Sequence, residues 1–213
     1  MTERELRRRG YGLVAGADEA GRGSLFGPVF AAAVTLDPEW PVRSLNDSKQ
    51  LLAPRREVLA GRIRQRAITW RVAAVDAATI DRINIYQASR LAMKLAIEAL
   101  SPAPDYVICD ALTLDIAAPQ KGIIKGDARC HAIAAASILA KVERDRCMAA
   151  WEQVYPGYGL AQHKGYPTPE HQEALERLGP TPLHRLSYAP VRACSRFPVD
   201  WNQLTLFEPD ECP

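Results

Sequence analysis

Two adjacent carboxylates, Asp18 and Glu19, end a short apolar run and stand directly before a glycine-rich segment. Like charges this close raise each other's pKa, and burial raises it further. A hard divalent cation that prefers oxygen ligands, Mg2+ or Mn2+, would stabilise such a pair. Gly21 and Gly23 let the backbone approach a ligand closely. The pattern predicts a metal site beside a bare backbone loop, which suits phosphate or sugar chemistry.

Two further acids follow short apolar segments. Asp110 comes after Val107-Ile108-Cys109, and Asp127 follows the run at Ile123 and opens the longest helical pattern. Ligands of open α/β sheets collect at strand ends, so we expect the four carboxylates to share one edge. Two divalent ions held there would activate water and stabilise the leaving oxygen in phosphodiester hydrolysis. Taken alone, Asp127 also fits a helix N-cap and Asp110 a turn residue.

The elements that must position these acids are strands and helices of one α/β layer structure. We predict strands at 11–17, 28–36, 67–75, 106–109 and 122–124, and helices at 54–65, 85–99, 128–154 and 169–178. The segment 132–140 is apolar on nearly every side and should be buried against the sheet. Residues 21–27 also spell Gly-x-Gly-x-x-x-Gly, but a dinucleotide-binding turn needs a helix next, and Pro28 with a β-like run follows instead.

Composition bounds the class of protein. The 213 residues are 47% apolar and 24% charged, with no run long enough to span a membrane, and we expect no signal peptide. Five cysteines, none in a Cys-x-x-Cys pair, indicate neither a disulfide framework nor a zinc site, so we expect a reducing cytoplasm. Residues 1–197 carry 27 Lys and Arg against 21 Asp and Glu, a balance that permits nucleic acid as a partner.

Five motifs occur in one order along the chain. They are Asp-Glu-Ala-Gly-Arg-Gly at 18–23, Asn-Asp-Ser-Lys at 46–49, Lys-Gly-Asp at 125–127, Ala-Ala-Ala-Ser-Ile-Leu-Ala-Lys-Val at 134–142 and His-Lys-Gly-Tyr at 163–166. Over roughly residues 11–192 the chain resembles bacterial ribonuclease HII. The resemblance implies a ribonuclease H-like mixed β-sheet flanked by helices, with a small helical C-terminal part. It also implies a metal-dependent endonuclease, holding two Mg2+ or Mn2+ ions. Its substrates would be the RNA strand of RNA–DNA hybrids and single ribonucleotides in duplex DNA. It would cut 5′ of the ribonucleotide, leaving a 3′-hydroxyl and a 5′-phosphate.

The resemblance also assigns roles to residues. The catalytic and metal-binding acids would be Asp18, Glu19, Asp110 and Asp127, and the substrate-binding residues Gly21, Arg22, Gly23, Lys49, His163, Lys164 and Tyr166. The glycine loop, residues 21–23, would read the ribose 2′-hydroxyl, which separates RNA from DNA. Tyr166 would stack on the sugar at the RNA–DNA junction, and Lys49, His163 and Lys164 would contact phosphates. We expect Arg144 and Asp145 to pair with each other on the long helix.

Some positions depart from the family pattern. Ser24 and Phe26 stand where proline and a small residue are common, Ala111 where glycine is common, and Cys130 and His131 where small or hydroxyl residues are common. None of these changes removes a carboxylate. They bear on the finer shape of the site.

Two rival functions remain open. Ribonuclease HIII is similar in its sheet but usually has an extra N-terminal domain and a lysine in the glycine loop, where this chain has Arg22. A non-catalytic nucleic-acid-binding module of the same fold would not need the four intact acids.

The acidic C-terminal segment is set apart from the rest. We predict a catalytic domain at 1–197 and a flexible tail at 198–213 in a monomeric protein without membrane contact. Within the tail, Gln203, Leu204, Leu206 and Phe207 form a peptide that resembles those by which bacterial repair proteins dock on the sliding clamp. The alternative is that its apolar side chains fold back on the protein's own core.

Overall fold

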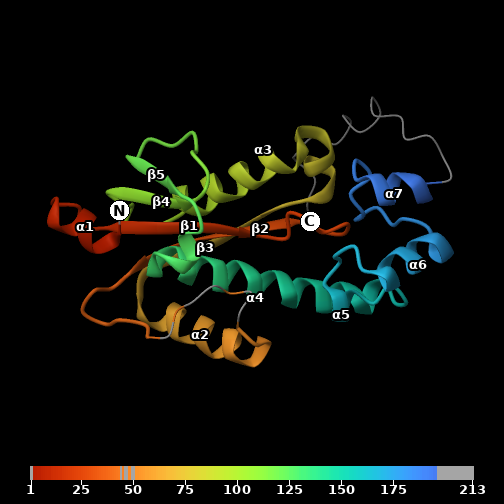
Figure 1. The fold of residues 1–213 in the computed structure, drawn as a ribbon, viewed down its shortest axis with the longest axis horizontal. Helices are drawn as coiled ribbons and strands as arrows, with labels where there is room; N and C mark the ends of the chain where they lie inside the picture. Colours follow the sequence, from red (N-terminus) through yellow and green to blue (C-terminus); the bar gives the residue numbers. More distant parts are fainter. Residues whose placement is uncertain (1, 44, 46–47, 49–50, 196–213) are drawn as a thin grey trace.

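Strand β1 (Val14–Ala20) lies at the centre of the sheet in the computed structural model, which describes residues 2–43, 45, 48 and 51–195. It pairs antiparallel with β2 (Val29–Leu36) and parallel with β4 (Tyr106–Asp110). Strands β3 (Ala67–Val75) and β5 (Gln120–Ile123) complete the order β3-β2-β1-β4-β5 (Figure 1). The sheet is therefore mixed, which confirms the predicted fold class.

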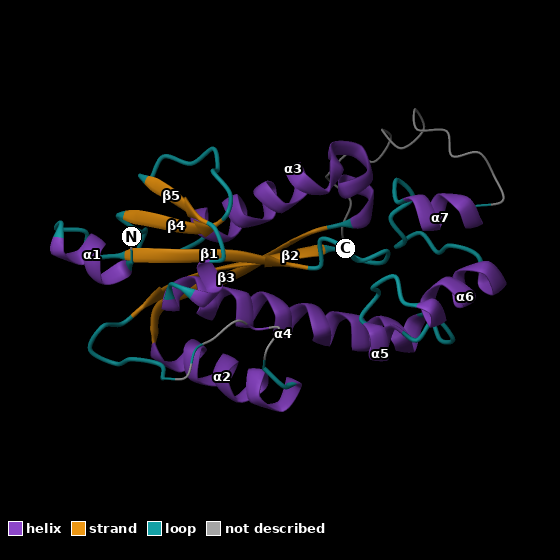
Figure 2. Ribbon diagram, viewed as in Figure 1, coloured by secondary structure: helices purple, strands orange, loops and turns teal. Residues whose placement is uncertain are grey.

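Helices cover both faces of this sheet. Helix α3 (Ala77–Glu98) packs on one face, and α4 (His131–Val154) and α2 (Ala53–Arg66) pack on the other (Figure 2). Helix α1 (Glu3–Arg8) lies beside the start of β1, and α5 (Leu160–His163), α6 (Pro169–Leu178) and α7 (Ala189–Cys194) gather at the opposite end. Among the described residues, none of the helices combines the length and the apolar character needed to cross a bilayer.

Helix α4 approaches β1 unusually closely because both contribute small residues. A Cβ atom at Gly16 would lie 2.2 Å from the carbonyl carbon of Ala132, far inside any allowed contact. The alanine-rich first half of α4 is buried as its all-round apolar pattern predicts. Residue size in this contact therefore fixes how α4 lies along the strand that carries Asp18.

Element boundaries near the predicted site differ from those expected. Strand β1 runs three residues further than predicted, so Asp18 and Glu19 lie within the strand rather than beyond its end. Pairing with β2 continues through Ala20, and these cross-strand bonds hold the acids in extended backbone. The long helix begins at His131, and a separate 3-10 turn, η2 (Gly126–Ala128), carries Asp127. The tail lies outside the described residues, so the division at residue 197 stays a prediction.

Replacing Gly16 tests the contact between β1 and α4. Gly16→Ala should lower the free energy of unfolding by about 3 kcal/mol, because the new methyl group forces strand and helix apart. Gly61→Ala is the matched control, since a Cβ at this α2 position meets no atom within 4 Å. The control should raise the free energy of unfolding by about 0.5–1 kcal/mol through helix propensity. Urea denaturation measures both, and equal stability of the two variants would contradict the close contact.

Candidate active site

The predicted carboxylates lie where strand β4 stops pairing with β1. The last parallel pair joins Ala17 to Cys109, while β1 continues for three residues paired only with β2. Asp110 ends β4 at this step in the sheet. The edge of β1 beside Asp18 and Glu19 is thus an open edge in the sense that it has no strand partner on the β4 side in the described sheet.

Asp18 points toward helix α4. Its side chain is 5% exposed, and its Oδ1 accepts a hydrogen bond from the Glu19 N–H at 2.8 Å. The Ser137 hydroxyl also bonds this carboxylate, and Ser137 is linked in turn to Ser48 across 2.8 Å. Burial raises the pKa of Asp18 well above its ordinary value, and repulsion from Glu19 and then Asp110 adds to the rise.

Glu19 points to the opposite face of the sheet, because successive strand residues alternate. Its Oε1 accepts a hydrogen bond from Arg22 Nη1 at 3.1 Å, while its Oε2 is buried without a partner in the described part of the chain. Burial is the main reason that the pKa of Glu19 is raised, and Arg22 opposes this rise. The side chains of Asp18 and Glu19 therefore do not lie together as one pair of metal ligands. They lie on different faces of the sheet beside the open edge of β1.

Cys109 lies close to three of the four acids. Burial, followed by repulsion from Glu19, Asp18 and Asp110, raises the pKa of its thiol to about 12. The thiol therefore stays neutral and packs as a small apolar group. These contributions also place the three carboxylates within electrostatic reach of one another.

Asp110 and Asp127 are linked through the η2 turn. The Gly126 N–H donates to Asp110 Oδ1 at 2.7 Å, and the Ala128 N–H donates to Asp127 Oδ1 at 2.9 Å. Asp127 does not cap the long helix, whose N-cap position is Cys130, so the N-cap explanation for this acid is wrong. After Asp110 the chain turns through Ala111 at φ 51°, a left-handed conformation that glycine adopts more easily.

The donor set suits a hard divalent cation, although the carboxylates are not drawn into one cluster. Among residues 2–43, 45, 48 and 51–195, no three His, Cys, Asp or Glu side chains are grouped closely enough to hold a metal ion. Each of the four acids accepts at least one hydrogen bond from a protein donor. The unpartnered Oε2 of Glu19 and the raised pKa of two buried carboxylates are features that a divalent cation would relieve.

The glycine loop is fastened to the segment that carries Tyr166. The Ser24 hydroxyl donates to the Gly165 carbonyl at 2.9 Å, and the Leu25 N–H donates to the same oxygen at 2.8 Å. Gly21 lies directly against the Arg144 side chain, where a Cβ would sit 2.1 Å from Nε. Positions 21–23 and 166 are therefore brought together, as their proposed joint action on one sugar requires.

Tyr166 rests on cationic side chains of α4. The Arg144 guanidinium lies 4.8 Å from the centre of its ring, and Lys141 Nζ lies 5.5 Å away. Arg144 is fully buried and donates from Nη2 to the Lys164 carbonyl at 2.6 Å. The predicted ion pair of Arg144 with Asp145 is wrong, because Asp145 pairs with Lys141 at 2.7 Å and with Arg56 at 3.4 Å.

Of the three residues predicted to contact phosphates, the structure describes His163 and Lys164. His163 has both ring nitrogens bonded to backbone, at Tyr158 O and Gly165 N, and stacks on His171 with 4.4 Å between ring centres. Lys164 is half-buried and donates from Nζ to the Ala161 carbonyl. Lys49 lies outside the described residues, as does the peptide at 203–207. Phosphate binding by Lys49, His163 and Lys164 stays a prediction.

A cavity of about 900 Å3 lies by α1 and is lined by side chains such as Arg4, Arg7 and Arg129. None of the predicted site residues lines it.

Two residues that the sequence reasoning missed hold the glycine loop from the C-terminal side. Arg185 and Tyr188 both donate hydrogen bonds to the Arg22 carbonyl. In the sequence they lie in a basic segment that resembles ordinary surface. Full burial of Arg185 distinguishes it, and burial of a lone arginine has no local sequence signal.

A mixed five-stranded sheet with carboxylates at a step between its central strands defines the ribonuclease H class of fold. The family model for ribonuclease HII matches residues 15–191. The chain is 67% identical to ribonuclease HII of Solibacter usitatus over 207 residues, which cover 97% of this chain and 91% of the relative. It therefore belongs to the ribonuclease HII family and is a type 2 ribonuclease H, an endonuclease.

Solved structures of archaeal proteins are similar over nearly the same region. Ribonuclease H2 from Pyrococcus horikoshii superposes with a TM-score of 0.74 at 26% identity, covering 90% of this chain and 98% of that one. The ribonuclease HII of Archaeoglobus fulgidus, solved in complex with PCNA, gives 0.72 at 27% identity, with 88% and 98% covered. Family membership settles the choice between ribonuclease HII and HIII in favour of HII.

Two buried histidines, His171 and His184, lie next to the Tyr166 backbone. The Thr181 N–H donates to His184 Nδ1 at 2.9 Å, which places the His184 proton on Nε2, 3.2 Å from Nε2 of His171. His171 Nδ1 in turn donates to the Tyr166 carbonyl at 3.0 Å. Burial, followed by repulsion from His171, lowers the pKa of His184 from 6.5 to about 3. Burial also lowers the pKa of His171, so both rings are neutral in the folded protein near pH 7.

We predict that stability falls as the pH drops from about 6.5 toward 3. The unfolded chain takes up a proton at residue 184 in this range while the folded protein does not, so the pair contributes fully only above pH 6.5. Between pH 6.5 and 4.5, the free energy of unfolding of His184→Asn should fall by about 2 kcal/mol less than that of the wild type. The exposed His131→Asn is the control and should follow the wild-type slope. Parallel curves for all three proteins in urea denaturation would contradict the prediction.

Proposed function

We propose that this ribonuclease H cuts both RNA–DNA hybrids and duplex DNA that contains a single ribonucleotide. Cleavage falls on the 5′ side of the ribonucleotide and leaves a 3′-hydroxyl and a 5′-phosphate. The observation that carries the proposal is the adjacency of acids and glycine loop, since Glu19 and Arg22 are joined across 3.1 Å at the open edge of β1. Cleavage at single ribonucleotides would assign the protein to ribonucleotide excision repair in the cytoplasm.

Mg2+ or Mn2+ ions would be bound by the carboxylate oxygens of Asp18, Glu19, Asp110 and Asp127. Such ions, when bound, supply an activated water and stabilise the leaving oxygen. The chain itself orients the oxygens, because Ser137 fixes Asp18 and the Gly126 N–H fixes Asp110. Asp127 either completes a second metal position or orients the water from the η2 turn.

Ribose is recognised by backbone rather than by a side-chain pocket. The glycine loop presents main-chain groups to the 2′-hydroxyl, and Gly23 has no atom within 4 Å of its Cβ position. Tyr166 stacks on the sugar at the junction, where an added 2′-hydroxyl would crowd its ring. The cations under Tyr166 support the ring in place. Lys49, His163 and Lys164 contact phosphates in this proposal, so substrate binding weakens as salt rises.

Replacing Asp127 tests the catalytic assignment. Asp127→Asn should lower kcat by about 100-fold, because an amide neither holds a divalent cation nor accepts a proton as a carboxylate does. The Ala128 N–H keeps an oxygen acceptor, so the melting temperature should stay close to that of the wild type. Cleavage of a duplex with one ribonucleotide, and of an RNA–DNA hybrid, gives the rate on each substrate.

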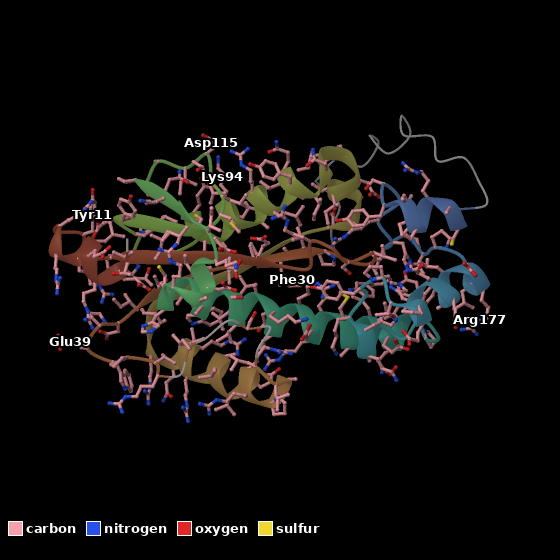
Figure 3. All side chains as sticks on the ribbon, in the orientation of Figure 1. Tyr11, Phe30, Glu39, Lys94, Asp115 and Arg177 are labelled. Atoms are coloured by element: carbon pink, nitrogen blue, oxygen red, sulfur yellow. The ribbon has the colours of Figure 1, made fainter. Side chains whose placement is uncertain are left out.

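Asp115→Asn is the matched control, because Asp115 pairs with Lys94 on the α3 side of the sheet and is 93% exposed (Figure 3). It should cleave at the wild-type rate. Undiminished cleavage by Asp127→Asn would overturn the assignment. Wild-type protein that cuts hybrids but leaves the single ribonucleotide intact would overturn the proposed substrate range.

The tail is proposed to dock on the sliding clamp through Gln203, Leu204, Leu206 and Phe207. Support comes from the peptide's resemblance to clamp-binding motifs and from the similar Archaeoglobus fulgidus protein, solved with PCNA. Leu206→Ala combined with Phe207→Ala should weaken binding to the bacterial clamp at least about tenfold by removing apolar anchors.

Two comparisons complete the clamp test. Deleting residues 201–213 should abolish clamp binding, and Asp210→Asn combined with Glu211→Gln should leave it close to the wild type. Surface plasmon resonance measures all three forms. Equal affinity of the deletion variant and the full chain would exclude the tail as the docking element.

A further inference from the structure

The Arg22 carbonyl in the glycine loop is held by two donors from the C-terminal part. Arg185 Nη1 donates to this oxygen at 2.8 Å, and the Tyr188 hydroxyl donates to it at 2.5 Å. Arg185 Nε donates to the Gly27 carbonyl at 2.9 Å. One guanidinium therefore bridges both ends of the loop from Arg22 to Gly27.

The donors themselves are fixed firmly. Arg185 is fully buried, its Nη1 lies 3.1 Å from the Tyr188 hydroxyl, and its guanidinium packs 5.4 Å from the centre of the Tyr188 ring. Backbone bonds run alongside, from Arg185 N to Leu25 O at 2.9 Å and from Gly27 N to Leu183 O at 2.8 Å. Residues 183–188 thus form a rigid support along the loop, and we call Arg185 and Tyr188 the loop clamp.

Holding the Arg22 carbonyl also determines the direction of the next N–H. The peptide bond between Arg22 and Gly23 is trans, so its C=O and N–H groups point in opposite directions. With the oxygen turned toward the loop clamp, the Gly23 N–H is turned away from it. Gly23 is exposed, and a Cβ at this position would meet no atom within 4 Å other than those of its chain neighbours, so a ligand can approach the residue.

The contacts of Arg185 and Tyr188 with the Arg22 carbonyl also bear on the position of Glu19. Arg22 directs its guanidinium to Glu19 Oε1 at 3.1 Å, and the position of this side chain depends on the backbone that the loop clamp fixes. Arg144 also lies against the loop, at Gly21. Two buried arginines therefore contact the loop, at Gly21 and at the carbonyls of Arg22 and Gly27, while Gly23 stays exposed.

We propose that Arg185 and Tyr188 are positioning residues that set the selectivity for ribose over deoxyribose. They act through the Arg22–Gly23 peptide, whose N–H they direct toward the sugar. The inference rests on the proposed reading of the 2′-hydroxyl by residues 21–23, and it adds the residues that make this reading specific.

Tyr188→Phe is the sharpest test, because it removes one donor and keeps the ring that packs on Arg185. Its kcat/KM on a duplex with one ribonucleotide should fall roughly tenfold. An all-DNA duplex of the same sequence, used as a competitive inhibitor, should keep its wild-type inhibition constant, because phosphate contacts are unaffected. The melting temperature should stay within a few degrees of the wild type. Arg185→Lys should show a larger loss, since an ammonium group cannot bridge Arg22 and Gly27 as the fork does.

Tyr158→Phe is the matched control, because the Tyr158 hydroxyl also donates to a backbone carbonyl at 2.5 Å, that of Gly179, away from the glycine loop. Tyr158→Phe should leave unchanged both the kcat/KM on the single-ribonucleotide duplex and the inhibition constant of the all-DNA duplex. Wild-type kcat/KM for Tyr188→Phe, or an equal loss in Tyr158→Phe, would overturn the inference. So would an equal weakening of the all-DNA inhibitor, which would indicate a general loss of duplex binding.

A binding measurement separates this inference from the proposed function. Fluorescence anisotropy in EDTA gives the ratio of affinities for an RNA–DNA hybrid and an all-DNA duplex without any cleavage. The ratio of hybrid affinity to all-DNA affinity should be smaller for Tyr188→Phe than for the wild type. An unchanged ratio would count against the proposed role of the loop clamp. Wild-type protein that binds hybrids selectively but does not cut the single-ribonucleotide duplex would contradict the proposed function alone.

Discussion

The close contact between β1 and α4 is the constraint on which the rest of the site depends. Gly16 lies against the backbone at Ala132, and from there strand and helix run side by side. Ser137 reaches Asp18, and Arg144, about two helical turns further on, reaches Gly21. A one-residue shift of α4 would rotate these side chains by about 100° and break both contacts. One small-residue contact thus aligns the buried acid and the glycine loop with the same helix.

Buried cations then hold the loop in a conformation that its own sequence does not impose. Arg144 and Arg185 are both fully buried, and each has N–H groups without a partner in the described part of the chain. Burying a charge is costly unless its contacts compensate, so such residues contribute little net stability. Their contacts are with backbone carbonyls of Arg22, Gly27 and Lys164, whose directions they fix. We interpret both arginines as residues that determine the shape of the site.

Local patterns predicted several elements well. Strand β3 and helix α6 were predicted at their observed bounds, the latter because Pro169 begins it and Gly179 follows it. The end of β1 was predicted too early, because pairing with β2 decides where that strand stops. The start of α4 was also misplaced, since the left-handed Lys125 and the η2 turn have no clear local signature. The predicted roles of the acids and of Tyr166 are consistent with their positions and stay predictions.

The sequence by itself determined the order of the elements, the family and the positions of the four acids and the glycine loop. These features are local, since hydrophobic periodicity, glycine and proline act on neighbouring residues. Tertiary structure alone decided that β4 stops pairing with β1 at Cys109, which leaves the edge of β1 beside Asp18 without a β4 partner, and that Asp18 and Glu19 face opposite sides of the sheet. It also decided what Arg185 binds, because its partner Arg22 lies 163 residues away in the chain. A buried side chain finds such a partner only when distant segments pack together, and no local pattern encodes that meeting.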